Sequence, residues 1–244
     1  MEAQQHYTFT DVSQIGSWRK RWDLSAIAKA TFPKEGAGRT FLEGGAGRGE
    51  MAHIVKSLGY QYIGIEPGDQ LRERLIQADF KVLSNTLPSM SGVDAASIDV
   101  FYSYDVVEHL DSYAAVIKML EETGRVLRPE GIVVAIAPNS ATLGYLFDFY
   151  EYQHQFLTTL PRLVAMFEDV GFQIDLARPF LTPLGLSRSG VVRAVDRVVA
   201  NAALVILRQR LVNSVLSFLI GSNLLFRIHK NVYDHVVVVA RKSG

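Results

Sequence analysis

The sequence contains no cysteine among its 244 residues. This absence excludes disulfide frameworks, thiolate zinc sites, iron–sulfur clusters and cysteine nucleophiles. A net charge is also missing, because 25 basic residues balance 25 acidic ones, and a neutral total argues against a general nucleic-acid binder. The first seven residues are polar and carry no apolar stretch typical of a signal peptide. We therefore expect a cytoplasmic protein that binds no nucleic acid.

The charge is unevenly distributed along the chain. Residues 188–230 contain seven basic residues and one acid, a net charge of +6, so the rest carries −6. Within this segment, residues 191–206 are amphipathic at helical spacing, and residues 211–226 form an apolar run of 16 residues. That run is short for a transmembrane helix. Three interpretations stay open, in this order of preference: a helical cover or dimer interface, an interfacial membrane helix, and a transmembrane span.

Strand-like and helix-like segments alternate along most of the chain. The predicted strands cover residues 39–43, 60–66, 80–83, 98–104, 131–137, 172–179 and 233–241. The predicted helices cover residues 51–58, 71–78, 113–127 and 158–170, after a helical lead-in over 8–32. This alternation predicts an α/β fold with a doubly wound parallel sheet. Ligands bind such sheets at the carboxyl ends of the strands, so we expect site residues directly after strands.

The first candidate site is a glycine-rich loop between a predicted strand and a helix. Residues 43–49 are Glu-Gly-Gly-Ala-Gly-Arg-Gly, and their glycines allow the backbone to approach a ligand closely. Glu50 stands where a dinucleotide-binding motif has its third glycine, and a carboxylate there disfavours a nucleotide-dependent oxidoreductase. Glu66 ends the second predicted strand. A carboxylate at that position can accept hydrogen bonds from both hydroxyls of a ribose.

These residues resemble the class I S-adenosylmethionine-dependent methyltransferases, in which an acid-x-G-x-G-x-G loop follows strand one and an acid ends strand two. Three further segments match in order: Tyr-Asp-Val-Val-Glu-His-Leu at 104–110, Leu-Arg-Pro-Glu-Gly at 127–131 and Phe-Glu-Asp-Val-Gly-Phe at 167–172. The resemblance covers about residues 40–180 and the final strand. It implies a Rossmann-like sheet of seven strands, mostly parallel with the last antiparallel, and a helical insertion before the last strand.

The resemblance also implies a domain division and a cofactor site. Residues 1–38 would form a lead-in or lid, 39–181 with 231–244 the cofactor-binding domain, and 182–230 the basic helical insertion. The cofactor would be S-adenosylmethionine, with S-adenosylhomocysteine as its product. The residues that would contact it, from the methionine part through the ribose to the adenine, are Glu43, Gly45, Gly47, Tyr104, Asp105, Glu66, Asn85 and Thr86.

The candidate catalytic residues are two histidines. His109 follows the fourth predicted strand, and His154 lies in an aromatic-rich segment, 145–156, that is expected to line an acceptor pocket. Either could act as a general base for a hydroxyl acceptor, or serve only to hold its loop in place. The run from Asp105 through Glu108 to His109 could hold a divalent cation, as similar runs do in quinone-biosynthesis and small-RNA-end methyltransferases. We rank the metal last and expect none.

The sequence therefore predicts a methyltransferase that acts on a small-molecule acceptor, with a hydroxyl oxygen favoured over nitrogen or carbon. The acceptor could be lipid-linked, and segment 182–230 could provide a peripheral membrane contact or a homodimer interface. The rival hypothesis is a domain that binds S-adenosylmethionine without transferase activity and serves assembly. Asn139, directly after the fifth predicted strand, could contact the acceptor or the loop backbone.

Overall fold

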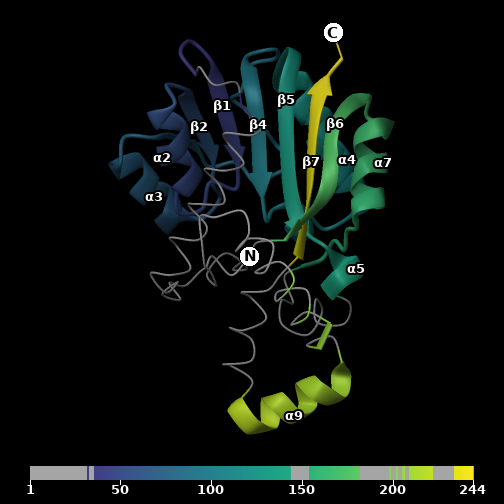
Figure 1. Cartoon of the computed structure of the whole chain (residues 1–244). Helices are drawn as coiled ribbons and strands as arrows, with labels where there is room; N and C mark the ends of the chain where they lie inside the picture. Colours follow the sequence, from purple (N-terminus) through teal and green to yellow (C-terminus); the bar gives the residue numbers. More distant parts are fainter. Residues whose placement is uncertain are drawn as a thin grey trace.

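The computed structural model describes residues 32, 36–143, 154–181, 198, 202, 205–206, 209–221 and 234–243. Its centre is a seven-stranded sheet in the order β3-β2-β1-β4-β5-β7-β6 (Figure 1). The strands are β1 (Thr40–Gly44), β2 (Gln61–Ile65), β3 (Lys81–Leu83), β4 (Ile98–Tyr104), β5 (Leu127–Pro138), β6 (Phe172–Leu181) and β7 (Asp234–Lys242). β7 runs antiparallel to both of its neighbours, and the other pairings are parallel. The predicted mostly parallel sheet with an antiparallel last strand is confirmed.

Helices pack on both faces of the sheet. The described helices are α2 (Glu50–Ser57), α3 (Asp69–Gln77), α4 (Tyr113–Val126), the short α5 (Ser140–Leu143), α7 (Leu160–Asp169) and α9 (Arg210–Ile220), with a 3₁₀ turn, η1, at Val107–His109. Of these, α2, α3, α4 and α7 pack on the sheet. Apolar residues of α4 and α7 form one buried cluster with one face of the sheet. Residues of α2, together with Leu75 of α3, form the second cluster with the opposite face. Apolar side chains on both faces explain why the central strands consist largely of hydrophobic residues.

β5 is longer than the sequence suggested. The predicted strand begins at Gly131, whereas the observed one begins at Leu127, where it pairs with Ile98 before the register shifts to Val100 and Ile132. Glu130 adopts a left-handed φ of 62° within this irregular stretch. A bulge of this kind lets the Leu-Arg-Pro-Glu-Gly segment stay at the sheet, although its proline and glycine are typical of a turn.

Three predictions concern residues outside the described part of the chain. They are most of the lead-in over 8–32, residues 145–153 of the aromatic segment, and most of the insertion over 182–230. Phe32 is the described residue of the lead-in. It is buried and packs edge-on against Phe41 and Tyr102, with ring centroids 5.1 Å and 6.2 Å away. The domain division stays a prediction.

The parallel strands bring their carboxyl ends to one edge of the sheet, the lower edge in Figure 1. In the register of this edge, Glu43 of β1 lies beside Tyr102 of β4. Tyr104 pairs with Ile136 of β5, and Pro138 pairs with His235 of β7. Because β7 is antiparallel, its first residues reach the edge where the parallel strands end. Any ligand site at this edge is therefore built from both early and late parts of the chain.

Candidate functional site

The glycine-rich loop is tied to the end of β2 by backbone hydrogen bonds. The N–H groups of Gly45 and Ala46 donate to the carbonyl of Ile65, at 2.9 and 3.0 Å. Gly45 has a φ of 75° and Gly47 a φ of 54°, in the left-handed region that favours glycine. A Cβ on Gly45 would lie 2.5 Å from Cγ2 of Val106. The chain after β4 thus packs directly on the loop, and only glycine allows that approach.

Glu66 lies where the glycine loop meets the end of β2. Its carboxylate accepts hydrogen bonds from the N–H groups of Gly47, at 2.8 Å, and Gly68, at 2.9 Å. Burial raises the pKa of the Glu66 carboxyl, although these two hydrogen bonds lower it. A carboxylate offers about four acceptor positions, so two remain for further donors. The vicinal hydroxyls of a ribose are donors of that kind.

A cavity opens beside the loop at the carboxyl ends of β1 and β4. Its lining residues are Glu43, Gly45, Ala46, Gly47, Glu50, Met51, Tyr102 and Tyr104. The predicted cofactor residues Glu43, Gly45, Gly47 and Tyr104 thus share one cavity. The buried Glu43 carboxylate accepts a hydrogen bond from the hydroxyl of Tyr62 at 2.6 Å. Burial and the neighbouring Glu43 raise the pKa of Tyr62 well above its ordinary value.

Tyr102 is a cavity residue that the sequence analysis missed. Its side chain is fully buried, and its hydroxyl has no hydrogen-bond partner among the described residues. Burial raises the pKa of this phenol well above its ordinary value, so the hydroxyl keeps its proton. It lies two residues before Tyr104 in β4, on the same face of the strand. That alternation was the signal in the sequence that could have identified it.

Asp105 and His235 form a second unit at the same edge. Nε2 of His235 donates to Oδ1 of Asp105 at 3.0 Å, across 130 residues of sequence. The His235 side chain is buried, and its ring lies 5.3 Å from the ring of Tyr104. Asp105 has a left-handed φ of 54°, a conformation that aspartate tolerates better than most residues. The sequence analysis missed His235, whose position depends on the pairing of β7 with β5.

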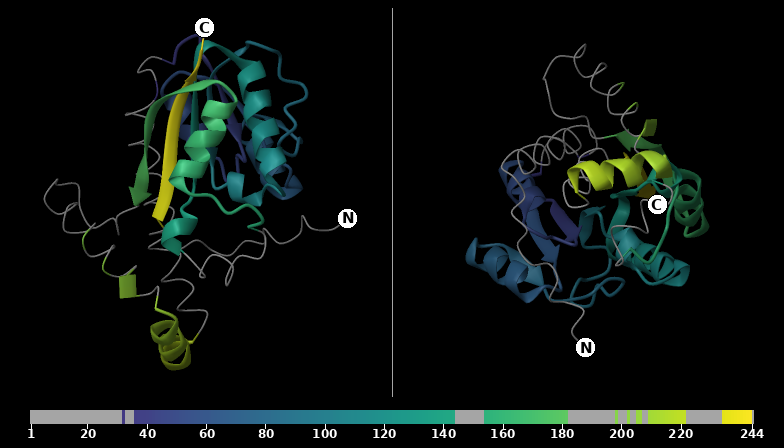
Figure 2. Two further views of the ribbon diagram at one scale, coloured as in Figure 1. Left: turned by 90° about the vertical axis from the view of Figure 1, so that its right-hand side faces the viewer. Right: turned by 90° about the horizontal axis from the view of Figure 1, so that it is seen from below.

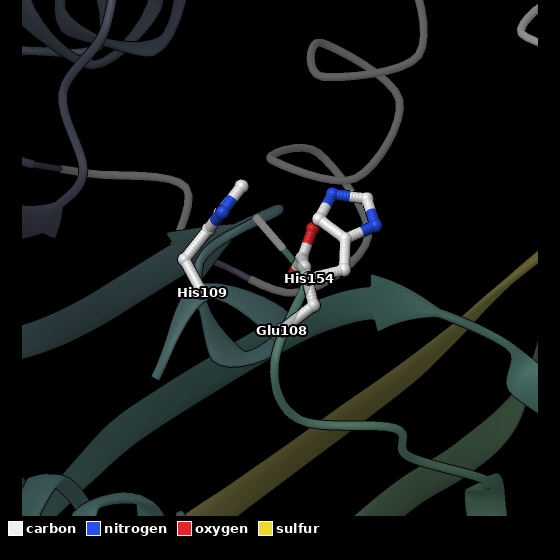
Figure 3. Close-up of side chains that lie close together, drawn as sticks. All are labelled: Glu108, His109 and His154. Atoms are coloured by element: carbon white, nitrogen blue, oxygen red, sulfur yellow. The ribbon is translucent and has the colours of Figure 1, made fainter. Parts of the chain in front are cut away.

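Glu108, His109 and His154 come together although two segments supply them (Figure 3). The two imidazole rings are 4.8 Å apart and nearly perpendicular, at 72°. One potential ligand atom from each of the three residues lies within 4.8 Å of the others. The N–H of Phe156 donates to the carbonyl of Glu108 at 3.1 Å, which joins the segment before α7 to η1. Both predicted catalytic histidines therefore lie in one cluster.

The donor set of this cluster, two imidazoles and a carboxylate, is one that divalent transition metals accept. The sequence analysis considered a different set, Asp105 with Glu108 and His109. Asp105 is not part of the observed group, because it contacts His235 instead. The expectation that no metal is bound stays a prediction.

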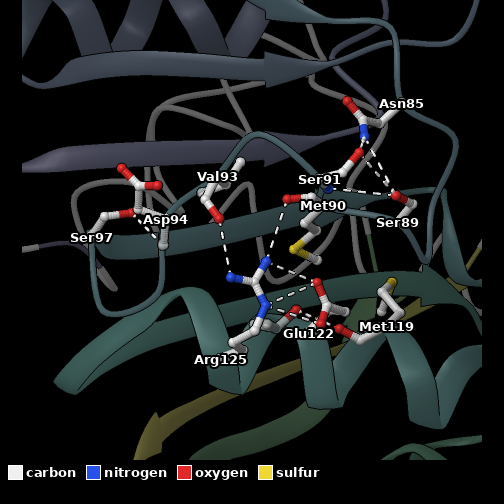
Figure 4. A network of polar contacts seen from close by, with 11 residues as sticks. Asn85, Ser89, Met90, Ser91, Val93, Asp94, Ser97, Met119, Glu122 and Arg125 are labelled. Carbon is white, nitrogen blue, oxygen red and sulfur yellow. Dashed lines mark hydrogen bonds and ion pairs between the residues drawn. The ribbon is translucent and has the colours of Figure 1, made fainter.

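The residues predicted to surround the adenine, Asn85 and Thr86, follow β3 in the sequence, and Figure 4 shows Asn85 with its polar neighbours. Asn85 is half-buried and Thr86 exposed. The Asn85 amide donates to the hydroxyls of Ser89 and Ser91. Neither Asn85 nor Thr86 lines the cavity beside the glycine loop, so their contact with an adenine stays a prediction. Of the two roles considered for Asn139, the structure shows a backbone contact, since its Oδ1 accepts from the N–H of Ala141 at 3.2 Å.

The sequence and the fold match known proteins. Residues 17–177 match the family model described as a methyltransferase domain. A segment of 110 residues, 43% of this chain, is 32% identical to a Mycolicibacterium smegmatis protein named a probable S-adenosylmethionine-dependent methyltransferase, and it spans 40% of that relative. A SAM-dependent methyltransferase structure from Archaeoglobus fulgidus aligns with a TM-score of 0.59 and 19% identity over 91% of this chain and 94% of that one.

A structure of phosphoethanolamine N-methyltransferase 2 from Haemonchus contortus, in complex with phosphomonomethylethanolamine and S-adenosylhomocysteine, aligns with a TM-score of 0.60 and 18% identity. It covers 96% of this chain and 58% of that one. At these identities the two structures show the fold alone. The family model covers well over half of the chain, and the chain belongs to this methyltransferase domain family, within the class I S-adenosylmethionine-dependent methyltransferases. The resemblance to that class is confirmed.

Proposed function

We propose that this protein transfers the methyl group of S-adenosylmethionine to a hydroxyl oxygen of a small-molecule acceptor, with His109 and His154 as the source of the general base. The observation that carries the proposal is the cluster of these histidines with Glu108. Glu108 and His109 lie in η1, shortly after β4, and Val106 of the same loop packs on Gly45 of the glycine loop. A proton acceptor is thereby available close to the cofactor cavity.

The residues beside the glycine loop suit the proposed cofactor. Gly47 and Glu66, joined by a 2.8 Å hydrogen bond, form a cradle whose free acceptor positions fit ribose hydroxyls. The buried carboxylate of Glu43 and the buried hydroxyl of Tyr102 fit the ammonium and carboxylate groups of a methionine moiety. When bound, S-adenosylmethionine supplies a methyl group that is already electrophilic because it is attached to a sulfonium.

The protein's own part in the reaction is to orient the acceptor and to remove a proton. Alignment of the acceptor oxygen within attacking distance supplies most of the acceleration. A hydroxyl must also lose its proton as the oxygen–carbon bond forms, and a neutral imidazole of His109 or His154 can take it up. Glu108, beside both rings, stabilises the imidazolium that results.

The test compares turnover with cofactor binding in His109→Gln and His154→Gln. With a panel of hydroxyl acceptors, we expect kcat/KM to fall by about 10²–10⁴ in at least one variant. Binding of S-adenosylhomocysteine, measured by calorimetry, should stay close to that of the wild type. His53→Gln is the matched control, because His53 is exposed on α2 and lies outside the cluster. Its ring packs on the ring of Phe80, with the two centroids 5.0 Å apart.

Other outcomes separate the rival hypotheses. Turnover with amines alone, unaffected by either substitution, would show N-methylation without a histidine base. Binding of S-adenosylhomocysteine without turnover on any acceptor would favour an assembly role. We expect dialysis against a chelator to leave the rate unchanged. If the rate is lost and a divalent cation restores it, Glu108, His109 and His154 act as metal ligands instead.

A further inference from the structure

α9 presents its apolar side to solvent. Phe218 is 89% exposed, Leu219 67% and Val215 50%, and these residues follow the i, i+3, i+4 spacing of one helix face. In a helix that packs on its own protein, the apolar face points inward. The orientation here is the reverse, and none of the described residues covers this side of α9.

A second group of described residues repeats the pattern. Residues 198, 202, 205 and 206 are helical and exposed, and the side chains of Val198, Val205 and Ile206 are 67%, 58% and 55% exposed. Their spacing of four, three and one residues also defines a single helix face. Two apolar faces within 23 residues are therefore turned to solvent. Exposed apolar faces of this kind mark an interaction site.

α9 lies well away from the sheet, beyond the edge where the parallel strands end (Figures 1 and 2). The cofactor cavity and the cluster of Glu108, His109 and His154 open at that same edge. A surface that binds α9 would therefore lie on the side of the molecule where the parallel strands end and the candidate site lies. None of the described helices has the length and apolar character needed to cross a bilayer.

We propose that α9, together with the exposed helical residues 198, 202, 205 and 206, docks on the surface of a bilayer that contains anionic lipids. Basic residues adjoin the apolar helix in the sequence: Arg208 and Arg210 at its start, Arg227 and Lys230 after it. Apolar residues inserted at the interface and arginines directed at lipid phosphates are the two components of interfacial binding. The +6 charge of segment 188–230 complements an anionic surface.

The same charge argues against a second copy as the occupant. A two-fold interface brings the same patch of each copy face to face. Pairing two copies through α9 would bring together two segments that each carry a net charge of +6. Neither segment has an excess of acidic residues to neutralise the other. A bilayer with anionic headgroups satisfies both the apolar face and the charge. Docking on it does not depend on which acceptor atom is methylated.

The test is sedimentation of the full chain with vesicles of phosphatidylcholine, alone or mixed with phosphatidylglycerol, without S-adenosylmethionine. We expect binding to the mixed vesicles that weakens with added salt. Phe218→Ser/Leu219→Ser should reduce the partition coefficient at least tenfold, and these exposed positions should tolerate the change. Ile76→Ser is the matched control, since Ile76 is 53% exposed on α3, and it should bind as the wild type does.

Two results would overturn the proposal. The first is that the wild type does not bind the mixed vesicles, or that the double variant binds them as strongly as the wild type does. The second is a wild-type dimer in light scattering that the double variant converts to a monomer, with no vesicle binding by either, which would identify a second copy as the occupant. Vesicle binding is measured without turnover, so a failure to bind vesicles would leave the proposed methyl transfer untouched. A failure of the methyl-transfer test would likewise leave the proposed docking on a bilayer untouched.

Discussion

At the scale of single residues, Tyr102 combines two properties that rarely occur together. Its hydroxyl is fully buried, and it lacks a hydrogen-bond partner among the described residues while lining the cavity beside the glycine loop. A buried hydroxyl without a partner destabilises the folded state. A ligand that supplies the missing partner removes that cost. We therefore propose that Tyr102 stabilises the complex with the cofactor more than it stabilises the free protein.

Tyr102→Phe should therefore separate binding from stability. We expect the Kd for S-adenosylhomocysteine to rise about 5- to 10-fold, the equivalent of ~1 kcal/mol for one hydrogen bond. The free energy of unfolding of the unliganded variant should equal or exceed that of the wild type in urea denaturation. Tyr62→Phe is the comparison, because the Tyr62 hydroxyl already donates to Glu43 and its loss should lower stability. A Tyr102→Phe protein with unchanged affinity would contradict the proposed contact.

Glu66 should make stability and cofactor affinity respond to pH in opposite directions. Burial raises the pKa of its carboxyl in the folded state, so its contribution to stability is present below the unfolded-state pKa. That contribution is lost as the pH rises through the raised folded-state pKa. Ribose hydroxyls donate to the ionised form, so affinity for S-adenosylhomocysteine should be highest above the raised pKa and decline below it.

The reference for this prediction is Glu66→Gln. Urea denaturation gives the free energy of unfolding of each protein at a series of pH values. The wild-type value minus the variant value should be largest at a pH near the ordinary carboxyl pKa and should decrease toward neutral pH. At neutral pH the variant should bind S-adenosylhomocysteine roughly 10- to 100-fold more weakly, since a hydrogen bond to a charged group contributes ~1.5–3 kcal/mol. Equal pH dependence in the two proteins would show that Glu66 does not titrate in this range.

At the scale of secondary-structure elements, the sequence could predict whatever depends on a local pattern. The strand–glycine loop–helix unit and the acid at the end of β2 are set by residues within a short window, so the sequence could locate Gly45, Gly47 and Glu66 after their strands. The structure joins the N–H of Gly47 to the Glu66 carboxylate at 2.8 Å. The joining of His109 with His154 was not predicted, because it depends on how the segment before α7 meets η1. Nothing in either local sequence encodes that contact.

Strand register decides the remaining cases. Tyr62 reaches Glu43 because Glu43 pairs with Gly64, two residues further along β2, which makes Tyr62 a diagonal neighbour on the same face. The start of β5 was misplaced because a bulge keeps Leu127 in the sheet despite turn-forming residues.

For α9, helical periodicity reveals an apolar face but is the same whether that face points inward or outward. Only the exposed fractions distinguish the two.

At the scale of the whole molecule, the antiparallel β7 connects the end of the chain to the site. β7 pairs with β5 from Ile132–Arg241 to Pro138–His235. This register places His235 at the carboxyl edge, where its Nε2 donates to Asp105 at 3.0 Å. Asp105 precedes the loop of Glu108 and His109. The last strand thereby holds the chain on which the proposed general base lies.

His235→Ala should uncouple the last strand from this loop. We expect the free energy of unfolding to fall by about 1–3 kcal/mol, because a buried side chain and a hydrogen bond to a carboxylate are both lost. Turnover should fall through kcat, while the Kd for S-adenosylhomocysteine changes less, since Gly47 and Glu66 are held by other contacts. His235→Gln, whose amide can donate to Asp105, should recover part of kcat. If His235→Ala loses stability but keeps its kcat, the contact joins the ends of the sheet without positioning the catalytic loop.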